Sequence, residues 1–177
     1  SLFGALPVTP AQTWADIGAG TGASLDFMGA RAQDFANIHL VDLSTSLLSV
    51  AEERVARRGL ENVTLHEADA TTFVPAGEGV DLVTFSYSLT MIPDWFAALE
   101  NARRMLKPGG HIGIVDFYVA RKQPVEPARR HGLFTRHFWP FWFANDNVFL
   151  SPDHLPWLNY HFDVVRREES YGNLPYI

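Results

Sequence analysis

The spacing of hydrophobic positions alternates along the chain between a strand-like and a helix-like pattern. It therefore predicts strands that alternate with helices. Short apolar runs of strand-like composition recur, and stretches with helical spacing of apolar residues separate them. The strands are predicted at residues 13–17, 38–42, 63–67, 80–86, 111–117 and 162–168, and the helices at residues 23–32, 44–58, 93–106 and 128–143. This alternation favours a Rossmann-like, doubly wound α/β fold with a mostly parallel sheet and helices on both faces.

Local signals at the ends of these helices support the assignment. Ser44 and Ser46 are candidate N-caps of the second helix, because serine side chains accept hydrogen bonds from the first free backbone amides. Gly59 is a natural C-terminal stop, because glycine readily takes the left-handed conformation that ends many helices. The third helix is expected to terminate at the Lys-Pro-Gly-Gly sequence of residues 107–110.

The strongest chemical signal lies near the N-terminus, in the stretch Trp14-Ala-Asp16-Ile-Gly18-Ala-Gly20-Thr-Gly22. It comprises the end of a predicted strand, three glycines at alternate positions and the approach to a predicted helix. In α/β proteins such a strand, turn and helix N-terminus hold nucleotide-like cofactors. Gly18 and Gly20 allow the backbone to approach a ligand closely and to adopt positive φ angles. The stretch therefore predicts an enzyme that uses a cofactor.

Asp16 distinguishes two classes of cofactor. Gly18, Gly20 and Ala23 also fit the dinucleotide pattern G-x-G-x-x-G/A. A carboxylate two residues before the first glycine would repel a pyrophosphate, because unit charges about 4 Å apart interact by ~1 to 4 kcal/mol. The same carboxylate suits a cofactor that presents an ammonium group and carries no phosphate, as S-adenosylmethionine does. Asp42 ends the next strand and would bind ribose hydroxyl groups in either case.

Four motifs resemble, in family order, those of class I S-adenosylmethionine-dependent methyltransferases: residues 16–22, Val41-Asp42, Glu67-Ala-Asp69-Ala70 and Leu106-Lys-Pro-Gly-Gly110. The resemblance implies S-adenosylmethionine as the cofactor and S-adenosylhomocysteine as its product. It also implies that the methionine part is held at the glycine turn, the ribose at Asp42 and the adenine edge at Asp69 and Ala70. The full predicted cofactor-binding set is Asp16, Gly18, Ala19, Gly20, Gly22, Asp42, Leu43, Asp69, Ala70, Ser86 and Tyr87.

Composition restricts the alternatives further. The 177 residues, 47% of them hydrophobic, suit a single domain over residues 1–177 with a hydrophobic core. The formal net charge of −6 argues against a nucleic-acid substrate, which favours a basic surface. The absence of cysteine excludes disulfides and thiolate chemistry, and a cytoplasmic location is expected. The seven histidines show no metal-ligand spacing, so no metal site is predicted.

Both ends of the chain look short for this family. Residues 1–11 alone precede the first predicted strand, where such methyltransferases usually have a helix. The chain stops at Leu174-Pro-Tyr-Ile177, without the usual antiparallel strand pair. Either the final strand is very short, or the domain is trimmed at both ends and a missing domain or a partner chain, a second copy included, completes the sheet. An exposed sheet edge would favour such pairing.

The segments after the fourth and fifth strands carry a second resemblance. Phe85-Ser-Tyr-Ser-Leu-Thr-Met-Ile-Pro93, Val115-Asp-Phe-Tyr118, an aromatic run between residues 138 and 152, and Asn173-Leu-Pro-Tyr176 resemble the methyltransferase portion of betaine lipid synthases. Those enzymes trimethylate the amine of diacylglycerylhomoserine. The resemblance implies an N-methyltransferase of betaine lipid synthesis, peripheral at the membrane, that contacts the membrane surface through residues 129–150.

The chemistry of amine methylation assigns roles to the remaining candidates. A neutral nitrogen must lie in line with the methyl donor, so positioning supplies much of the rate. Aromatic faces and carboxylates stabilise the cation that grows as methyl groups are added. The predicted catalytic residues are Tyr87, Asp116 and Tyr118. The predicted substrate-binding residues are Tyr118, Trp139, Trp142, Asp146 and Arg136, with Arg129 and Arg130 as further partners of the homoserine carboxylate or of anionic head groups.

Other functions fit the same residues. One is a methyltransferase whose acceptor is phosphatidylethanolamine, a quinone or a small soluble amine. Another is a non-catalytic module that keeps the nucleoside pocket as a scaffold for a partner. The aromatic run also fits an ordinary covering helix, which would remove the membrane contact. A nicotinamide-dependent oxidoreductase is disfavoured by Asp16.

Overall fold

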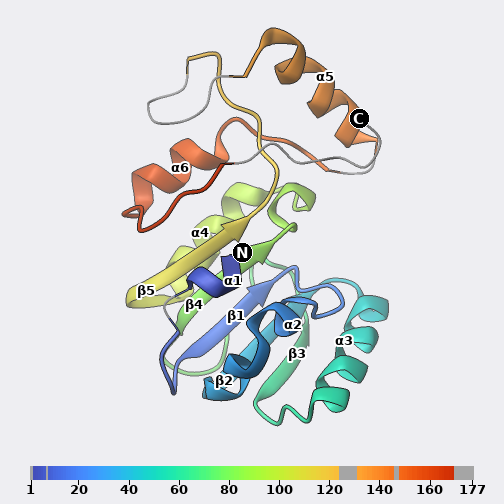
Figure 1. Cartoon of the computed structure of the whole chain (residues 1–177), viewed down its shortest axis with the longest axis vertical. Coiled ribbons are helices and arrows are strands. Elements are labelled where there is room, and N and C mark those ends of the chain that lie inside the picture. Colours follow the sequence, from blue (N-terminus) through green and yellow to red (C-terminus); the bar gives the residue numbers. More distant parts are fainter. Residues whose placement is uncertain (1, 7, 124–130, 146–147, 170–177) are drawn as a thin grey trace. The chain divides into compact units, whose positions relative to one another are not determined.

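The computed structural model describes residues 2–6, 8–123, 131–145 and 148–169 (Figure 1). Contacts between Cα atoms divide the chain into two compact units, Ser1–Asp116 and Phe117–Ile177. The first unit contains the sheet and the glycine-rich turn, and the second contains the aromatic run. The single domain that the sequence predicts over residues 1–177 stays a prediction.

The first unit is built on a five-stranded sheet in the order β3-β2-β1-β4-β5. Its strands are β1 (Thr13–Ile17), β2 (Asn37–Asp42), β3 (Val63–Glu67), β4 (Val80–Ser86) and β5 (Leu106–Val115). All adjacent pairs are parallel, and Asp16 of β1 lies beside Leu40 of β2 and Thr84 of β4. The predicted doubly wound α/β fold is confirmed. Because the strands are parallel, their carboxyl ends meet at one edge, where such sheets bind ligands.

Helices cover both faces of this sheet. They are α1 (Leu2–Ala5), α2 (Ser24–Met28), α3 (Thr45–Arg58) and α4 (Trp95–Met105), with 3₁₀ turns η1 (Gly29–Asp34) and η2 (Leu89–Met91). In Figure 1, α1 and α2 lie in front of the sheet and α4 lies behind it. Trp14 and Leu40 belong to the core cluster shared with α1, α2 and α3, and their strand neighbours Ala15 and Val41, which point to the other face, are also buried. Burial on both faces is typical of a parallel sheet.

The helix ends follow local signals in the sequence. Ser44 caps α3 by accepting a hydrogen bond from its first turn, and Gly59 ends that helix with a φ of 62°. The N-cap predicted at Ser44 and the stop predicted at Gly59 are thereby confirmed, whereas the alternative N-cap Ser46 is wrong, because it lies inside the first turn of α3. Asp94 caps α4 in the same way, so the helix predicted at residues 93–106 is one or two residues shorter at each end.

Two predicted elements have different limits in the structure. The helix predicted at residues 23–32 ends early, because Gly29 takes a φ of 65° and converts the continuation of α2 into a 3₁₀ turn. The strand predicted at residues 111–117 starts earlier and stops at Val115. The Lys-Pro-Gly-Gly sequence does follow the end of α4, but it belongs to β5, where Lys107 Nζ lies 3.0 Å from Asp81 Oδ2 of β4.

The second unit contains α5 (Leu133–Ala144) and α6 (His154–His161). The helix predicted at residues 128–143 begins at Leu133 in the structure, because Gly132 has an extended backbone conformation and precedes the first helical turn. Residues 128–130 of the predicted helix lie outside the described residues. The strand predicted at residues 162–168 is wrong, because residues 162–169 form no strand. Val164 and Val165, which would point to opposite faces of a strand, are both exposed there. Arg166 and Glu168 form a local ion pair instead.

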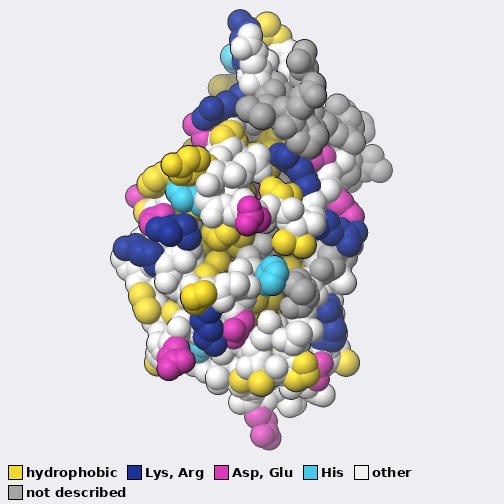
Figure 2. Space-filling model, turned by 90° about the vertical axis from the view of Figure 1, so that its left-hand side faces the viewer, with side chains coloured by type: hydrophobic (Ala, Val, Ile, Leu, Met, Phe, Trp, Pro, Cys, Tyr) yellow, Lys and Arg dark blue, Asp and Glu magenta, His cyan; other side chains and the backbone are white. Residues whose placement is uncertain are grey.

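Side chains of both charges are interspersed on the face shown in Figure 2, with hydrophobic side chains between them. Within the described residues, no helix combines the length and the apolar character needed to cross a bilayer. In the same part of the chain, His, Asp and Glu side chains do not gather in groups of three or more that could hold a metal ion.

Candidate active site

The glycine-rich turn is attached to the end of β2 by its backbone. Gly18 N and Ala19 N both donate to the carbonyl oxygen of Val41, at 2.8 and 3.0 Å. The three glycines of the turn have positive φ angles between 53° and 69°. A Cβ atom on Gly18 would lie 2.4 Å from Ser88 Cβ, so the loop after β4 leaves no room for a side chain there. The turn thus needs glycine for its conformation and for its packing.

Asp16 lies in a buried hydrogen-bond network at this turn, with 2% of its surface exposed. Its Oδ1 accepts from Thr84 Oγ1 and its Oδ2 accepts from Ser24 Oγ, both at 2.5 Å. Thr84 Oγ1 also accepts from Trp14 Nε1 at 2.7 Å. Because the indole nitrogen can only donate, the single hydroxyl hydrogen of Thr84 must point to Asp16. The network therefore fixes the orientation of the carboxylate.

Burial makes Asp16 an unusual carboxyl group. Removal from water raises its pKa from 3.8 to about 6, while the hydrogen bonds from Ser24 and Thr84 lower the pKa and the charge of Asp42 raises it. The charge of Asp42, at the end of β2, thus disfavours the ionisation of Asp16. A cationic group bound next to both would relieve this repulsion, whereas a phosphate would add to it.

Asp42, at the end of β2, connects the turn to α3. Its Oδ2 accepts from Gly20 N and its Oδ1 from Ser44 N, both at 2.8 Å. A Cβ atom on Gly20 would have Leu47 Cδ1 of α3 as its nearest neighbour, 4.0 Å away, so the turn is open to a ligand on that side. Leu43 is 69% exposed next to Asp42. A carboxylate beside apolar side chains at this edge suits a ribose and its base.

The loop after β3 is shaped by Asp69 and held by α4. Asp69 Oδ1 accepts from Thr71 N and Thr71 Oγ1, at 2.8 and 2.7 Å, which lowers the pKa of this exposed carboxyl group. Asn101 of α4 is buried and donates from Nδ2 to the carbonyl oxygens of Ala70 and Phe73, at 3.0 and 2.8 Å. The residues predicted to bind adenine therefore form a defined turn after the carboxyl end of β3.

Tyr87 adopts a backbone conformation that is rare for an aromatic residue. It follows Ser86, the last residue of β4, with a φ of 53°, and its backbone nitrogen donates to the carbonyl oxygen of Val115 at 2.8 Å. Its side chain is more than half exposed. Strained residues of this kind are concentrated at functional sites. This strain is a second observation in favour of the role predicted for Tyr87.

Asp116 follows β5 and is tied to the loop after β4. Its Oδ1 accepts from Thr90 Oγ1 at 2.8 Å and its Oδ2 from Thr90 N at 3.0 Å. The structure therefore brings several predicted residues to the ends of neighbouring parallel strands. From one side of the sheet to the other, they are Asp69 and Ala70 after β3, Asp42 and Leu43 at β2, the glycine turn after β1, Ser86 and Tyr87 at β4, and Asp116 after β5.

The remaining predicted residues belong to the second unit. Tyr118 donates its hydroxyl hydrogen to Glu169 Oε2 at 2.8 Å. Arg136, Trp139 and Trp142 lie on α5, the first two partly buried and Trp142 exposed. Three further predicted residues lie outside the described residues: Asp146, Arg129 and Arg130. The roles of all these residues stay predictions.

Four residues that support the site were missed by the sequence analysis: Ser24, Thr84, Ser88 and Asn101. All four are buried; Thr84, Ser88 and Asn101 each join segments that are distant in the sequence, and Ser24 joins α2 to the end of β1. For Thr84 and Asn101 a signal exists, because a polar residue at an apolar position of a central strand or helix needs a hydrogen-bond partner. The two serines lie near element ends, where such residues are common and carry no comparable signal.

Fold and site together define an α/β domain with a glycine turn and several carboxylates at the carboxyl ends of its parallel strands. The methyltransferase domain family matches residues 15–110, just over half of the chain. The chain belongs to this family.

Three relatives illustrate the range of similar proteins. Demethylmenaquinone methyltransferase from Halalkalibacterium halodurans is 25% identical over 135 residues, which are 75% of this chain and 54% of that protein. The chain thus spans about half the length of this curated relative. The crystal structure of a candidate methyltransferase from Bacillus halodurans has a TM-score of 0.72 at 21% identity and covers 90% of this chain and 66% of that one, which shows the shared fold.

The third relative was solved with ligands bound. It is phosphoethanolamine N-methyltransferase 2 from Haemonchus contortus, in complex with phosphomonomethylethanolamine and S-adenosylhomocysteine. Its TM-score is 0.66 at 25% identity, and the match covers 87% of this chain and 32% of that one.

Proposed function

We propose that this chain binds S-adenosylmethionine and transfers its methyl group to an acceptor. The observation that carries the proposal is the acidic glycine turn, in which the buried Asp16 lies close enough to Asp42 for each charge to raise the energy of the other. S-adenosylmethionine carries an ammonium and a sulfonium group and no phosphate, so its charge complements this site. A dinucleotide would place a pyrophosphate at the same turn, next to two carboxylates.

In this proposal, different residues of the first unit bind different parts of S-adenosylmethionine. The glycine turn holds the methionine part, Asp42 accepts from the ribose hydroxyl groups, and Leu43 with Leu47 packs against the nucleoside. Asp69 and Ala70 face the adenine edge. When bound, S-adenosylmethionine supplies an electrophilic methyl group, which the acceptor takes by forming a new bond to carbon while the sulfur keeps the electron pair of the bond that breaks. Tyr87 and Asp116 orient the acceptor in this proposal.

We propose the amine of diacylglycerylhomoserine as the acceptor, on the strength of the sequence resemblance to betaine lipid synthases. Aromatic faces stabilise a substrate that becomes a quaternary ammonium ion, and Tyr87 is the candidate for that contact in the first unit. A prenylated quinone is the second candidate, because the curated relative from Halalkalibacterium halodurans is a demethylmenaquinone methyltransferase. Phosphoethanolamine is the third, because of the solved complex from Haemonchus contortus.

A methyl-transfer assay separates these acceptors. The purified chain would be incubated with methyl-labelled S-adenosylmethionine and one of four acceptors: diacylglycerylhomoserine, phosphatidylethanolamine, demethylmenaquinone or phosphoethanolamine. We expect label on the homoserine lipid well above label on the other three. Preferential labelling of the quinone or of phosphoethanolamine would replace the proposed acceptor and leave the methyltransferase proposal standing. Binding of S-adenosylmethionine without turnover on any acceptor would favour the scaffold function.

We also propose that α5 contacts the membrane surface. One side of this helix carries an aromatic series at helical spacing, in which Phe134 stacks on Phe138 and Phe138 stacks on Trp142, with ring centroids 4.8 and 5.9 Å apart. Phe134 and Phe141 are 70% and 75% exposed. The helix has no acidic residue in its first turn and includes Arg136. Exposed aromatic residues with a basic residue are typical of helices that lie in the membrane interface.

Removal of two aromatic rings tests this contact. The double variant Phe141→Ala with Trp142→Ala should bind anionic phosphatidylglycerol vesicles at least several-fold more weakly, because each large ring contributes apolar area to interfacial binding. Its affinity for S-adenosylhomocysteine should not change. Tyr160→Ala removes another highly exposed aromatic residue, on α6, and serves as the matched control. Equal vesicle binding by all three proteins would exclude the proposed role of α5.

A further inference from the structure

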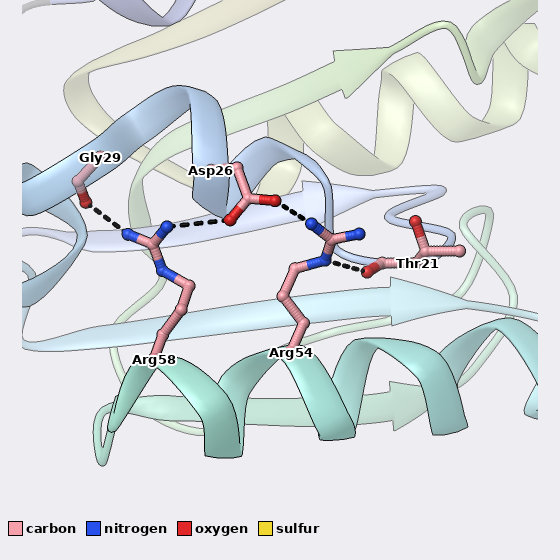
Figure 3. Close-up of polar contacts among 5 residues, drawn as sticks. All are labelled: Thr21, Asp26, Gly29, Arg54 and Arg58. Atoms are coloured by element: carbon pink, nitrogen blue, oxygen red, sulfur yellow. Dashed lines mark hydrogen bonds and ion pairs between the residues drawn. The ribbon is translucent and has the colours of Figure 1, made fainter.

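Two arginines of α3 hold the segment that contains the glycine turn and α2 (Figure 3). Arg54 donates from Nε to the carbonyl oxygen of Thr21 at 2.9 Å and forms an ion pair with Asp26 through Nη1. Arg58, one helical turn further on, pairs with the other oxygen of Asp26 at 2.9 Å and donates from Nη2 to the carbonyl oxygen of Gly29 at 2.9 Å. A single carboxylate therefore receives both guanidinium groups.

The two arginines differ in what else they hold. The carbonyl that Arg54 contacts belongs to Thr21, which lies inside the turn between Gly20 and Gly22. The carbonyl that Arg58 contacts belongs to Gly29, at the far end of α2. Both share Asp26, so their ion pairs are closely matched. Arg54 alone of the two makes direct contact with the turn.

Arg54 contacts the second half of the turn, beyond the amides of Gly18 and Ala19 that donate to Val41. Glycines lose more conformational freedom on folding than other residues, so a turn with three of them needs external contacts to keep one shape. One contact is already present on the other side, where Gly20 N donates to Asp42. Asp42 lies just before α3, whose N-cap is Ser44. Helix α3 therefore begins beside Asp42, the proposed ribose ligand, and also carries Arg54, which contacts the glycine turn.

We propose that Arg54 is a positioning residue for the cofactor: it sets the distance between the glycine turn, which holds the methionine part, and Asp42, which holds the ribose. This inference rests on the proposed function. Arg54 contacts no ligand in it. Its guanidinium makes one hydrogen bond to the turn and one ion pair to α2, which arginine achieves with its planar fork and lysine, as a point charge, does not. Because Arg54 holds the turn in the conformation that binds the ligand, less ordering is needed on binding, and the affinity for the ligand is higher.

The test compares Arg54→Met with Arg58→Met, in the full chain. Each variant removes one ion pair to Asp26, and Arg54→Met alone removes the contact to the turn. We expect Arg54→Met to weaken S-adenosylhomocysteine binding by about five- to ten-fold, and Arg58→Met by less than about two-fold, with similar losses of melting temperature. Arg54→Lys should recover part of the melting temperature and little of the affinity.

Hydrogen exchange of the ligand-free protein adds a readout that does not depend on the ligand. The Gly22 amide, which donates to Ala19 within the turn, should exchange faster in Arg54→Met than in Arg58→Met. Equal exchange in both variants, or equal losses of affinity, would show that the clamp serves stability alone and would overturn the inference. Failure of the wild-type chain to bind S-adenosylhomocysteine would instead contradict the proposed function, while the exchange result would still report on the turn.

Discussion

At the scale of single residues, the site depends on a carboxylate that the fold both buries and orients. Asp16 is removed from water, which favours its protonated form, and two hydroxyl groups donate to it, which favours its ionised form. Burial has the larger effect, so its pKa is raised to about 6. At neutral pH the group is still ionised, and it can attract a cation at the turn. By donating to Asp16, the hydroxyl group of Thr84 lowers the pKa of this carboxyl group and so helps to keep it ionised when the ligand binds.

Thr84→Val tests this coupling. Without the hydroxyl the pKa of Asp16 should rise further above about 6. Binding of S-adenosylmethionine at pH 7 should then weaken, slightly while the pKa stays below 7 and by about ten-fold for each unit by which the pKa exceeds 7. The pH at which affinity is lost should move upward. Thr84→Ser keeps the hydroxyl and should behave like the wild-type chain. An unchanged pH profile in Thr84→Val would contradict the role of this hydroxyl.

The stability of the chain should show the same coupling with a definite sign. Because the folded-state pKa of Asp16 lies above the unfolded value of 3.8, the folded protein binds the proton more tightly. This group therefore makes stability fall as pH rises from about 4 to about 6. In Thr84→Val that fall should extend to higher pH, which urea titrations at a series of pH values would measure.

At the scale of elements, a pair of histidines links β2 to β3. His39 Nδ1 lies 3.0 Å from His66 Nε2, and the ring of Phe73 packs on both. Burial lowers the pKa of each histidine, and the charge of His66 lowers the pKa of His39 further. Both groups titrate below their unfolded value in the folded chain, so the unfolded chain takes up protons first as pH falls. Their contribution to stability is therefore lost below about pH 6.5.

A double variant isolates this contribution. His39→Phe with His66→Phe should lose less stability than the wild-type chain between pH 6.5 and pH 5, because the proton uptake that favours unfolding is gone. Asp16 acts with the opposite sign in part of this range but is common to both proteins, so the difference between their urea midpoints reports the histidines. His137→Gln, on the exposed surface of α5, is the control. A pH dependence as steep in the double variant as in the wild-type chain would refute the assignment.

Elements with local signals could be predicted from the sequence, and elements that depend on distant contacts could not. Ser44 and Gly59 define the ends of α3 by their own chemistry. The early end of α2 also has a local signal, which is Gly29. The prediction missed it because Gly29 lies inside a stretch with helical spacing of apolar residues. The strand expected at residues 162–168 failed because a strand needs a partner and a buried face, and Val165 is 78% exposed.

The candidate site shows the same division. The residues that end strands, such as Asp16 and Asp42, could be found from the motif and its position after an apolar run. The contacts that support them could not. A polar Thr84 in an apolar strand indicates that it has a partner, but not that this partner lies 68 residues away, and Arg54 contacts a carbonyl group 33 residues away. Only the packing of β4 on β1, and of α3 on the turn, makes these contacts possible.

At the scale of the whole molecule, the first unit contains all the described residues assigned to the cofactor. It spans Ser1–Asp116 and includes the five strand ends, so cofactor binding should be a property of this unit. The substrate residues on α5 belong to the second unit. S-adenosylhomocysteine should bind the folded chain and not the unfolded one. It should therefore raise the free energy of unfolding, by about 2.7 kcal/mol at a ligand concentration one hundred times the dissociation constant.

Hydrogen exchange with and without S-adenosylhomocysteine would locate this effect. We expect added protection in residues 16–22, 42–47 and 69–71 and at the loop after β4, because their amides and carboxylates surround the proposed ligand. Amides of α5 and α6 should change less. Protection confined to the second unit would mean that the ligand binds elsewhere.

The most direct test of the central claim is titration calorimetry of the purified chain with S-adenosylmethionine, S-adenosylhomocysteine and NAD. The charge of Asp16 and Asp42 predicts binding of the first two ligands and none of the third, because NAD brings a pyrophosphate to the same turn. Binding of NAD in preference to the other two would contradict the account of the acidic turn. Binding of none of the three would contradict the proposal that this chain holds a nucleoside cofactor.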